Sequence, residues 1–230
     1  MINITLPEGS FARRLSFYLA MEEYVARQQL SDDAFFLWQV EPSVIFGRNQ
    51  VVENEVNMEY CREHGIQVYQ RKSGGGCVYA DRDNLMLSYV TKEQQVGFAF
   101  NRFVNMLLLV LRKIGVEATG TRHNDIMISD RKVCGTACRV TPYGCVVHST
   151  MLYDTNMQHM LQAITPSQEK LAKNGVESVR QRITLLKDYT SLTLEEIKIL
   201  IIQTLCDKER LLTDVDVSLI EEIENNQIVK

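Results

Sequence analysis

The sequence lacks a membrane span, an export signal and a strong net charge. No apolar run approaches the length that a transmembrane helix needs. The first five residues lack the basic and then apolar pattern of a signal peptide. The formal net charge is only −4, so an anionic ligand would need a local positive site. These absences predict a cytoplasmic protein with neither membrane nor nucleic-acid partners.

The six cysteines show no spacing typical of a metal site. Without an export signal they are expected to be free thiols. Cys134, Cys138, Cys145 and His148 could be grouped as a zinc site, but their spacing contains no CxxC pair. The three cysteines alternate with apolar residues in strand-like segments, which favours buried small hydrophobic side chains over metal ligands.

The composition and periodicity favour one α+β domain. Hydrophobic residues make up 45% and charged residues 23%, and no repeat, low-complexity tract or linker interrupts the chain. Apolar spacing predicts helices over 14–29, 54–65, 98–114, 157–164 and 167–173. Thr193 followed by Glu196 is a capping-box pattern that begins a helix through Leu205. Short apolar runs predict strands over 35–40, 43–47, 66–71, 76–80, 84–91, 116–119, 125–129, 132–141 and 144–153. Ser-Asp-Arg at 129–131 is expected to form a hairpin turn between two of them. Short strands mixed with amphipathic helices predict a mainly antiparallel sheet packed with helices.

The run from Gln70 to Tyr79 carries the most chemical information. Three consecutive glycines, Gly74 to Gly76, allow positive φ and close approach of the backbone to a ligand. Arg71 and Lys72 precede them, so the turn is suited to hold a phosphate. It lacks the Gly-Lys-Ser/Thr of a P-loop, and a strand follows it instead of a helix. A phosphate or carbonyl cradle in a β-hairpin and a plain glycine turn with solvated basic flanks both remain open.

Two further segments hold polar residues in strand-like surroundings. Lys132 begins an apolar stretch, and an enclosed lysine can stabilise an acyl carbonyl or phosphate as charge develops. The alternative is a solvated lysine on an edge strand. His148 lies in a second apolar stretch, where a structural hydrogen-bonding histidine is the simpler interpretation.

Together these segments resemble the lipoate–protein ligase A family, a branch of the biotin/lipoate protein ligase superfamily. The resemblance runs from about Phe36 to Leu205, and its motifs are more specific in combination than singly. They are Leu-Trp at 37–38, Val-Ile-Phe-Gly-Arg-Asn-Gln at 44–50, Arg-Lys-Ser-Gly-Gly-Gly-Cys-Val-Tyr at 71–79, Asn-Asp-Ile at 124–126, Arg-Lys-Val-Cys-Gly-Thr-Ala at 131–137, His148 before Met-Leu at 151–152, and the segment 170–183.

The resemblance implies a ligase that uses ATP and Mg²⁺ to convert lipoate to lipoyl-AMP and pyrophosphate. The lipoyl group then passes to a lysine of a carrier domain, such as the E2 subunit of a 2-oxoacid dehydrogenase or the glycine cleavage H protein. It also implies the fold of the biotin/lipoyl protein ligase catalytic domain. The chain, 1–230, is expected to be that single domain without the family's usual small C-terminal domain. A separate accessory domain is then expected to assist activation, unless the protein only transfers a pre-activated acyl group.

Residue roles follow from the same resemblance. Lys132 is the expected catalytic residue, holding the lipoyl carbonyl and the adenylate oxygen. Arg71 is expected to bind phosphate, and Asn124 and Asp125 to place the nucleotide, with Asp125 holding Mg²⁺. The backbone of 76–79 is expected to line the nucleotide and the acyl chain. The full set of expected binding residues is Arg71, Ser73, Gly74, Gly75, Gly76, Cys77, Val78, Tyr79, Asn84, Asn124, Asp125, Lys132, Gly135, Ala137 and His148.

The chain departs from the family pattern at three motifs. Family members usually have His-Asp-x-Gly-Asn where this chain has Ala80 to Asn84. The usual Ser-Gly-Ser/Asn-Ala after the lysine is Cys-Gly-Thr-Ala at 134–137, and the usual His-Gly is His148-Ser149. These changes motivate a lipoyl-binding relative that has lost catalysis as one alternative.

The second alternative is an octanoyl- or lipoyltransferase that forms a thioester on a cysteine beside a lysine. Cys134, Cys138 and Cys145 lie near Lys132 in the sequence. Transferase branches, however, place their cysteine in other motifs, where this chain reads Ile-Thr-Pro-Ser at 164–167 and His-Asn-Asp at 123–125. A biotin ligase is less favoured, because the segment 170–183 is closer to the lipoate branch.

Overall fold

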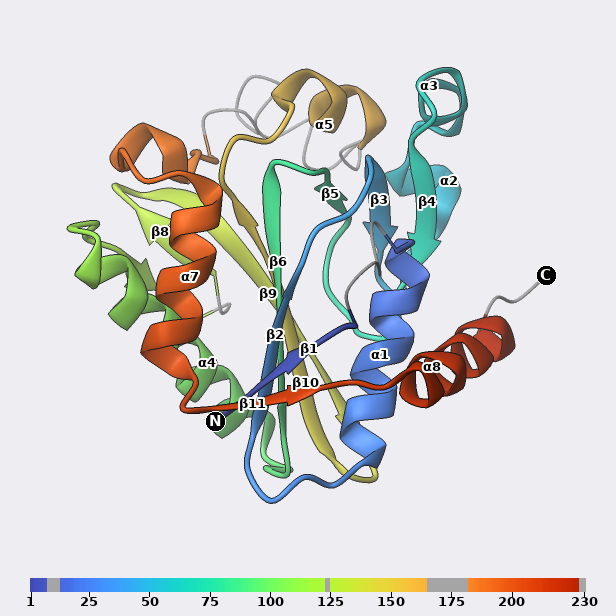
Figure 1. Ribbon diagram of the computed structural model, residues 1–230. Helices are drawn as coiled ribbons and strands as arrows, with labels where there is room; N and C mark the ends of the chain where they lie inside the picture. Colours follow the sequence, from blue (N-terminus) through green and yellow to red (C-terminus); the bar gives the residue numbers. More distant parts are fainter. Residues whose placement is uncertain (8–12, 123–124, 165–181, 228–230) are drawn as a thin grey trace.

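The computed structural model describes residues 1–7, 13–122, 125–164 and 182–227. Two sheets organise this part of the chain, an eight-stranded sheet in the order β11-β1-β2-β6-β10-β9-β8-β7 and a three-stranded sheet in the order β4-β3-β5. Figure 1 shows the long strands of the larger sheet crossing the middle of the molecule, with the smaller sheet beside their upper ends.

The larger sheet is antiparallel except at one edge. Its strands are β1 (Ile2–Thr5), β2 (Ala34–Trp38), β6 (Asn84–Thr91), β7 (Thr119–Gly120), β8 (Ile126–Ile128), β9 (Arg131–Thr141), β10 (Gly144–Leu152) and β11 (Lys208–Leu211). Only β11, β1 and β2 run parallel to one another. Central β6 is buried along its whole length, as expected of a strand covered on both faces.

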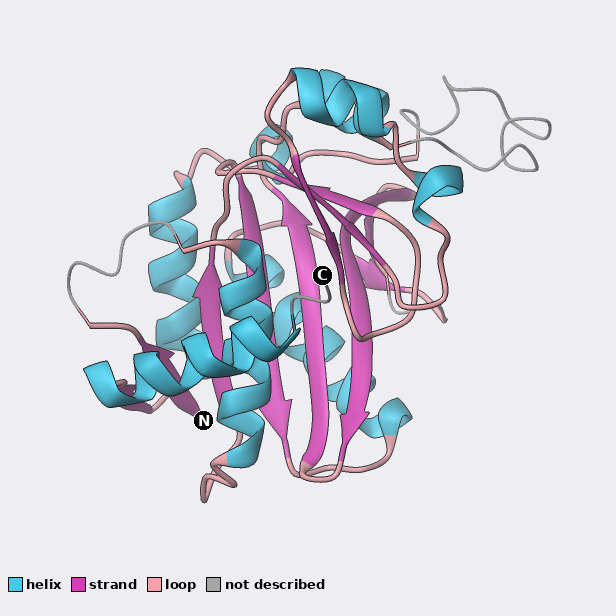
Figure 2. Ribbon diagram, turned by 90° about the vertical axis from the view of Figure 1, so that its right-hand side faces the viewer, coloured by secondary structure: helices cyan, strands magenta, loops and turns pink. Residues whose placement is uncertain are grey.

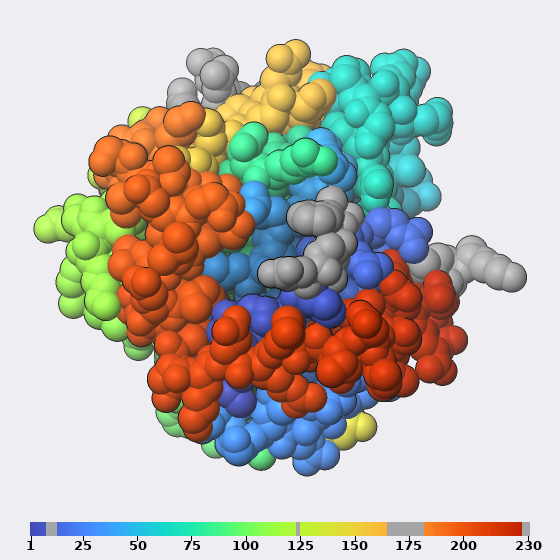
Figure 3. Space-filling model, in the orientation of Figure 1, coloured from blue at the N-terminus to red at the C-terminus, as the bar shows by residue number. Residues whose placement is uncertain are grey.

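Helices cover both faces of this sheet. On one face lie α1 (Leu15–Arg27) and α8 (Asp214–Gln227), whose apolar residues join one buried cluster with β2. On the other face lie α4 (Val96–Lys113) and α7 (Leu194–Leu205), which pack over β8, β9 and β10. Figure 2 shows helices on both sides of the strands, and Figure 3 shows the C-terminal segments spread across the front of the molecule. The α+β expectation is confirmed.

The smaller sheet holds the glycine run. It comprises β3 (Ser43–Phe46), β4 (Gln67–Gln70) and β5 (Val78–Ala80), and its outer side packs on α2 (Val52–Glu55), α3 (Met58–Glu63) and α5 (Met157–Ala163). A short 3₁₀ helix, η1 (Leu186–Tyr189), precedes α7. Because β3 lies between β4 and β5, the glycines join strands that are not neighbours. The run is therefore not the turn of a β-hairpin, and the prediction of a hairpin at this place is wrong.

Most predicted elements are confirmed within a few residues, with two exceptions. The helix expected over 54–65 is two short helices, because Val56 forms a β-bridge with Ile164 and Asn57 caps a new helix by accepting from the N–H of Tyr60 at 3.0 Å. The strand expected over 116–119 is only Thr119–Gly120. The predicted hairpin turn is confirmed, since Ser129 and Asp130 have φ of 46° and 64°, as a type I′ turn requires.

Four elements were not predicted, namely β1, η1, β11 and α8. The strands β1 and β11 are only four residues long, and they pair with each other although they lie at opposite ends of the sequence. The capping box is confirmed, since Thr193 Oγ1 accepts from Glu196 N and Glu196 caps Thr193 in return. The helix predicted over 167–173 lies outside the described residues. Within the described ranges, no helix is both long and apolar enough to cross a membrane.

Candidate active site

A cavity of about 580 Å³, counting its mouth, lies between the two sheets. Its inner wall is apolar and its outer part carries the glycine run and Lys132. Such a shape suits a ligand with a long apolar tail and a polar head. The lining residues are Leu19, Trp38, Ile45, Arg71, Gly75, Gly76, Cys77, Val78, Met86, Lys132, Gly135, Thr136, Ala137, His148, Ser149 and Thr150.

A β-bulge turns Lys132 toward this cavity. Ile126 pairs with Cys134 and Met127 with Lys132, which leaves Val133 as an extra residue in β9. Val133 and Cys134 both join the core on the α4 side. Strict alternation would have sent Lys132 to the same face as Cys134, and the bulge places it on the opposite face. The lysine belongs to a strand paired on both sides, so the edge-strand alternative is wrong.

The ammonium of Lys132 is held at the rim of the cavity. Its Nζ lies 2.8 Å from Asp125 Oδ1, and the two side chains are 38% and 27% exposed. The backbone is held from the other side, where Lys132 N donates to Arg182 O at 2.7 Å and Thr184 N donates to Lys132 O at 2.9 Å. A cation anchored at its base and paired at its tip is suited to stabilise developing negative charge.

The side chain of Arg71 holds the glycine run in place through hydrogen bonds to its carbonyl groups. Its side chain is buried, and Nη2 donates to the carbonyls of Gly74 at 2.8 Å and Gly76 at 2.7 Å, while Nη1 donates to Ile45 O at 3.1 Å. Across a trans peptide, a carbonyl and the following N–H point in opposite directions. The N–H groups of Gly75 and Cys77 therefore point away from Arg71, and both residues line the cavity.

Two glycines near the run are required by the backbone, one by a close contact and one by its conformation. A Cβ on Gly47 would lie 2.4 Å from Gly75 O. Gly75 has φ of +95°, a conformation that residues with a side chain rarely adopt. The absence of a side chain at Gly47 therefore lets the run lie close to the end of β3. The carbonyls of Gly74 and Gly76 in the run accept from the guanidinium of Arg71.

His148 lies in a buried chain of hydrogen bonds at the inner end of the cavity. Its Nδ1 is 3.0 Å from Glu22 Oε2 and its Nε2 is 2.8 Å from Ser73 Oγ. Because a carboxylate only accepts, Nδ1 carries a proton and donates to Glu22. Ser88 Oγ donates to Glu22 at 2.7 Å and in turn accepts from Trp38 Nε1 at 2.9 Å. The histidine has the structural role that its surroundings suggested and also lines the cavity.

The cysteine thiols are poorly suited to act as nucleophiles. Burial raises the pKa of Cys77, Cys134 and Cys138 to about 12 each, and the pKa of Cys145 is also raised by burial. The thiolate is the reactive form, so these groups are protonated near neutral pH.

The positions of the side chains also exclude a zinc site formed by the three cysteines and His148. Cys134 and Cys145 are buried in the core on the α4 side, and Cys138 packs against the same core. His148 faces α1 on the opposite side of β10. Within the ranges that the structure describes, no three His, Cys, Asp or Glu side chains are grouped to hold a metal ion.

The structure brings most of the predicted residues to one place. Arg71, Gly75, Gly76, Cys77, Val78, Lys132, Gly135, Ala137 and His148 line the cavity, Ser73 contacts His148, and Asp125 contacts Lys132. Gly74 belongs to the same loop through its carbonyl. Asn124 and most of the segment 170–183 lie outside the described residues.

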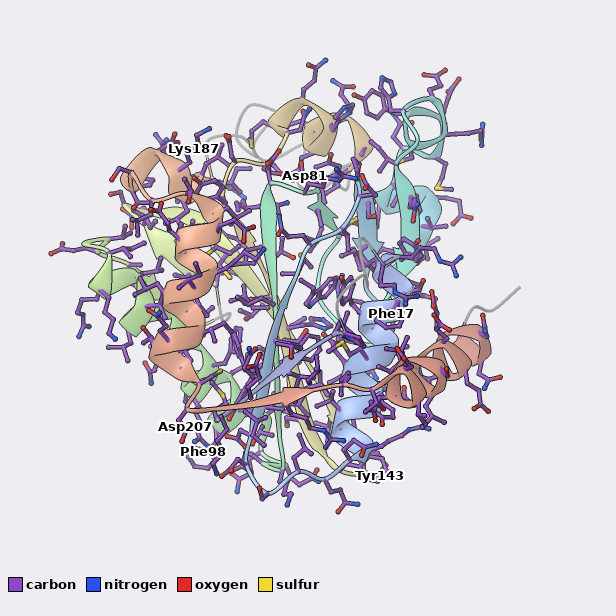
Figure 4. All side chains as sticks on the ribbon, viewed as in Figure 1. Phe17, Asp81, Phe98, Tyr143, Lys187 and Asp207 are labelled. Atoms are coloured by element: carbon purple, nitrogen blue, oxygen red, sulfur yellow. The ribbon has the colours of Figure 1, made fainter. Side chains whose placement is uncertain are left out.

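Two of the predicted binding residues, Asn84 and Tyr79, do not line the cavity. Asn84 is completely buried, and its Nδ2 donates to Thr155 Oγ1 at 3.0 Å. Tyr79 is 1% exposed and packs in the cluster under α3 and α5. Asp81, which accepts from Thr155 Oγ1 at 3.0 Å, lies at the end of the sheet below α5 (Figure 4). These hydrogen bonds of Asn84, Asp81 and Thr155 connect the turn before β6 to the segment that precedes α5.

The most important residue that the sequence interpretation missed is Glu22. As a charged residue, Glu22 would be expected on the polar side of its helix, yet it is 3% exposed and accepts from both His148 and Ser88. A signal was present, since Glu22 follows Tyr18 by four positions and precedes Val25 by three, which places it within the apolar stripe. Trp38 and Met86 of the apolar wall were not expected at the site.

The comparisons with known proteins agree with this fold. The family described as "Lipoyl protein ligase A/B catalytic domain" matches residues 15–206. A lipoate–protein ligase, LplJ, of Bacillus subtilis (strain 168) is 34% identical over 184 residues, which cover 78% of this chain and 56% of the relative. Lipoate–protein ligase 1 of Staphylococcus aureus (strain Mu50 / ATCC 700699) is 33% identical over 217 residues, covering 91% of this chain and 66% of the relative.

The chain belongs to the lipoyl protein ligase A/B catalytic domain family. Its matched part spans 56% and 66% of the lengths of these two relatives. Solved structures share the fold. A lipoate–protein ligase A described as bound with ATP has a TM-score of 0.83 at 24% identity, covering 97% of this chain and 94% of that one. A bi-partite ligase of Thermoplasma acidophilum, described with its E2 lipoyl domain, has the same TM-score and identity over 97% and 91%.

Proposed function

We propose that this protein is a lipoate–protein ligase that forms lipoyl-AMP from lipoate and ATP and transfers the lipoyl group to a lysine of a carrier domain. The observation that carries the proposal is Lys132, whose ammonium lies at the rim of an apolar cavity beside the glycine run. The names of its relatives, and the structural neighbours described with ATP and with lipoic acid, support the same substrates.

In the first step the lipoate carboxylate attacks the α-phosphorus of ATP, and pyrophosphate leaves. The apolar wall, which includes Leu19, Trp38 and Met86, would hold the hydrocarbon tail of lipoate. The lipoate carboxylate would then lie at the rim of the cavity near Lys132. Lys132 would neutralise charge on the carboxylate and phosphate oxygens as the anhydride forms. The outward N–H groups of Gly75 and Cys77 would donate to the same oxygens.

In the second step the carrier lysine, as a neutral amine, attacks the acyl carbon and AMP leaves. The tetrahedral intermediate carries an oxyanion, which Lys132 is placed to stabilise. Activation by AMP supplies a good leaving group, so the chemistry requires no cysteine, in keeping with the raised thiol pKa values. Arg71 would act through the loop that it shapes, because its guanidinium donates to loop and strand carbonyls.

Asp125 is the described residue best suited to hold Mg²⁺. It is a partly exposed carboxylate at the mouth of the cavity, 2.8 Å from Lys132. Magnesium typically takes one or two protein carboxylates together with substrate phosphates. The ion would supply charge neutralisation at the phosphates, while Asp125 also orients the lysine.

Mass spectrometry of a carrier domain tests the proposal. The carrier, an E2 lipoyl domain or a glycine cleavage H protein, is incubated with this protein, ATP, Mg²⁺ and lipoate. A mass gain equal to one lipoyl group is expected and would establish a self-sufficient ligase. A gain only with synthetic lipoyl-AMP would assign transfer to this chain and activation to an accessory domain supplied separately. No gain in either reaction would overturn the proposal and favour a lipoyl-binding relative without catalysis.

A further inference from the structure

A second hollow adjoins the cavity and has a different character. It measures about 1610 Å³ with its open mouth and lies between α1, β9 and the ends of β3 and β4. We call it the basic groove, because its lining carries five cations and one carboxylate, Glu22. The cations are Arg14, Arg48, Arg71, Lys72 and Arg139. This concentration occurs in a chain whose formal net charge is −4.

Nearby carboxylates neutralise these charges only in part. Glu23 lies 2.7 Å from Lys72 Nζ and 3.4 Å from Arg139 Nη1. Glu224 lies 3.4 Å from Arg14, whose side chain is 60% exposed. Arg48 is exposed and forms no ion pair with any described residue. The five cations thus outnumber the three nearby carboxylates, Glu22, Glu23 and Glu224, so the electrostatic potential in the groove is positive.

The groove and the acyl cavity share a wall. Leu19, Arg71 and His148 line both hollows. The backbone N–H of Arg48 donates to Ser73 O at 3.1 Å, so the groove adjoins the glycine run, and the side chain of Arg48 takes no part in that bond. A partner in the groove would thus contact the back of the loop whose other side faces the acyl carbonyl.

We propose that the basic groove binds an acidic surface of the carrier domain and holds it beside the cavity while its lysine reacts. This inference rests on the proposed function. The cations are spread over the start of α1, the turn after β3, the segment around the glycine run and β9. Such a spread suits several carboxylates on a folded partner better than one compact anion. Complementary charge at such a site chiefly speeds encounter and selects the partner. A protein with net charge −4 has little overall attraction for nucleic acid, which disfavours that occupant.

The test separates docking from chemistry by using two acyl acceptors. The carrier domain is titrated in the ligase reaction, and hydroxylamine is used in parallel as a small neutral acceptor of the lipoyl group. Arg48→Glu is expected to raise KM for the carrier at least tenfold and to leave lipoyl hydroxamate formation within twofold of wild type. Arg112→Glu, an exposed arginine near the end of α4 on the opposite face, is the matched control and should change neither. Melting temperatures of both variants exclude unfolding.

Salt adds an independent readout, because screening acts on exposed charges. Raising NaCl should raise the carrier KM of wild type more steeply than that of Arg48→Glu. An unchanged carrier KM in Arg48→Glu would overturn the groove proposal. A rise confined to the KM of ATP or lipoate would also overturn it, since the groove would then hold a small anion. Absence of hydroxamate with wild-type protein, lipoate and ATP, together with no carrier lipoylation from synthetic lipoyl-AMP, would instead count against the proposed function. Carrier binding, followed by NMR titration of wild type and Arg48→Glu, would then decide the groove separately.

Discussion

The side chain of Lys132 lies directly over the α-carbon of Gly135. A Cβ on Gly135 would be 2.7 Å from Lys132 Cε and 2.8 Å from its Nζ, closer than real Cβ contacts allow. The glycine three residues after the lysine therefore provides the space in which the ammonium lies. Asp125 is also nearby, with Oδ1 3.9 Å from the same point.

Gly135→Ala should accordingly displace the ammonium of Lys132. We expect carrier lipoylation to fall roughly 100-fold, because displacement of a catalytic group by about 1 Å has effects of that order. Far-UV circular dichroism should be unchanged. Gly97→Ala is the matched control, since a Cβ there meets no heavy atom within 4 Å. A Gly135→Ala variant with wild-type turnover would show that the position of the lysine is not critical.

Lys132→Ala should abolish lipoyl transfer while leaving the fold intact. Loss of a charge-stabilising donor commonly lowers kcat by about 10²–10³-fold. Lys113→Ala, at an exposed position near the end of α4, serves as the control. Transfer from synthetic lipoyl-AMP is the measurement, because it isolates the second step. Normal turnover by the variant would mean that the assigned role of Lys132 is wrong.

Removal of Glu22 should destabilise the protein, because Ser88 Oγ and His148 Nδ1 would lose a buried acceptor. For Glu22→Ala we expect the free energy of unfolding to fall by about 1–3 kcal/mol, the usual cost of a buried unpaired polar group. Urea unfolding measures this. Glu222→Ala, on the exposed side of α8, should be close to neutral. Equal stability of the two variants would contradict the structural role of the Glu22–His148 chain.

Activity should not depend on a cysteine. Burial raises the pKa of Cys138 to about 12 and that of Cys206 to about 11, so alkylation by iodoacetamide at pH 7 is expected to be slow. The Cys77→Ala, Cys134→Ala and Cys138→Ala variants should each retain most of the lipoylation activity. A covalent acyl-protein intermediate, or complete loss of activity in one of these variants with normal folding, would instead support the transferase alternative.

Glu23 should contribute stability that depends on pH. Burial acts to raise its pKa, but Lys72, Arg139 and Arg27 outweigh burial and lower the pKa from 4.5 to about 2. A carboxyl whose pKa is lower in the folded state stabilises the fold above its unfolded pKa and loses that contribution as pH falls through the folded value. The stability difference between wild type and Glu23→Gln should therefore be full at pH 6 and shrink between about pH 4.5 and 2. A constant difference over that range would exclude this ion-pair cluster as the cause.

Local patterns were sufficient to predict much of this protein. The capping box at Thr193 and the turn at Ser129 depend on residues within a few positions, so the sequence alone identified both. The same holds for the fully buried strand β6, whose bounds match the prediction. The order of the motifs around Arg71, Lys132 and His148 was enough to indicate the family.

Tertiary structure decided how these residues meet. The position of β3 between β4 and β5, the bulge at Val133 and the burial of Glu22 against His148 all depend on contacts between distant segments. Each outcome is a choice of pairing or register, which side-chain periodicity alone leaves undetermined. The sequence thus indicated which residues are candidates for the chemistry. Strand order and packing decided that Lys132 faces the cavity and that Arg71 supports the loop from beneath.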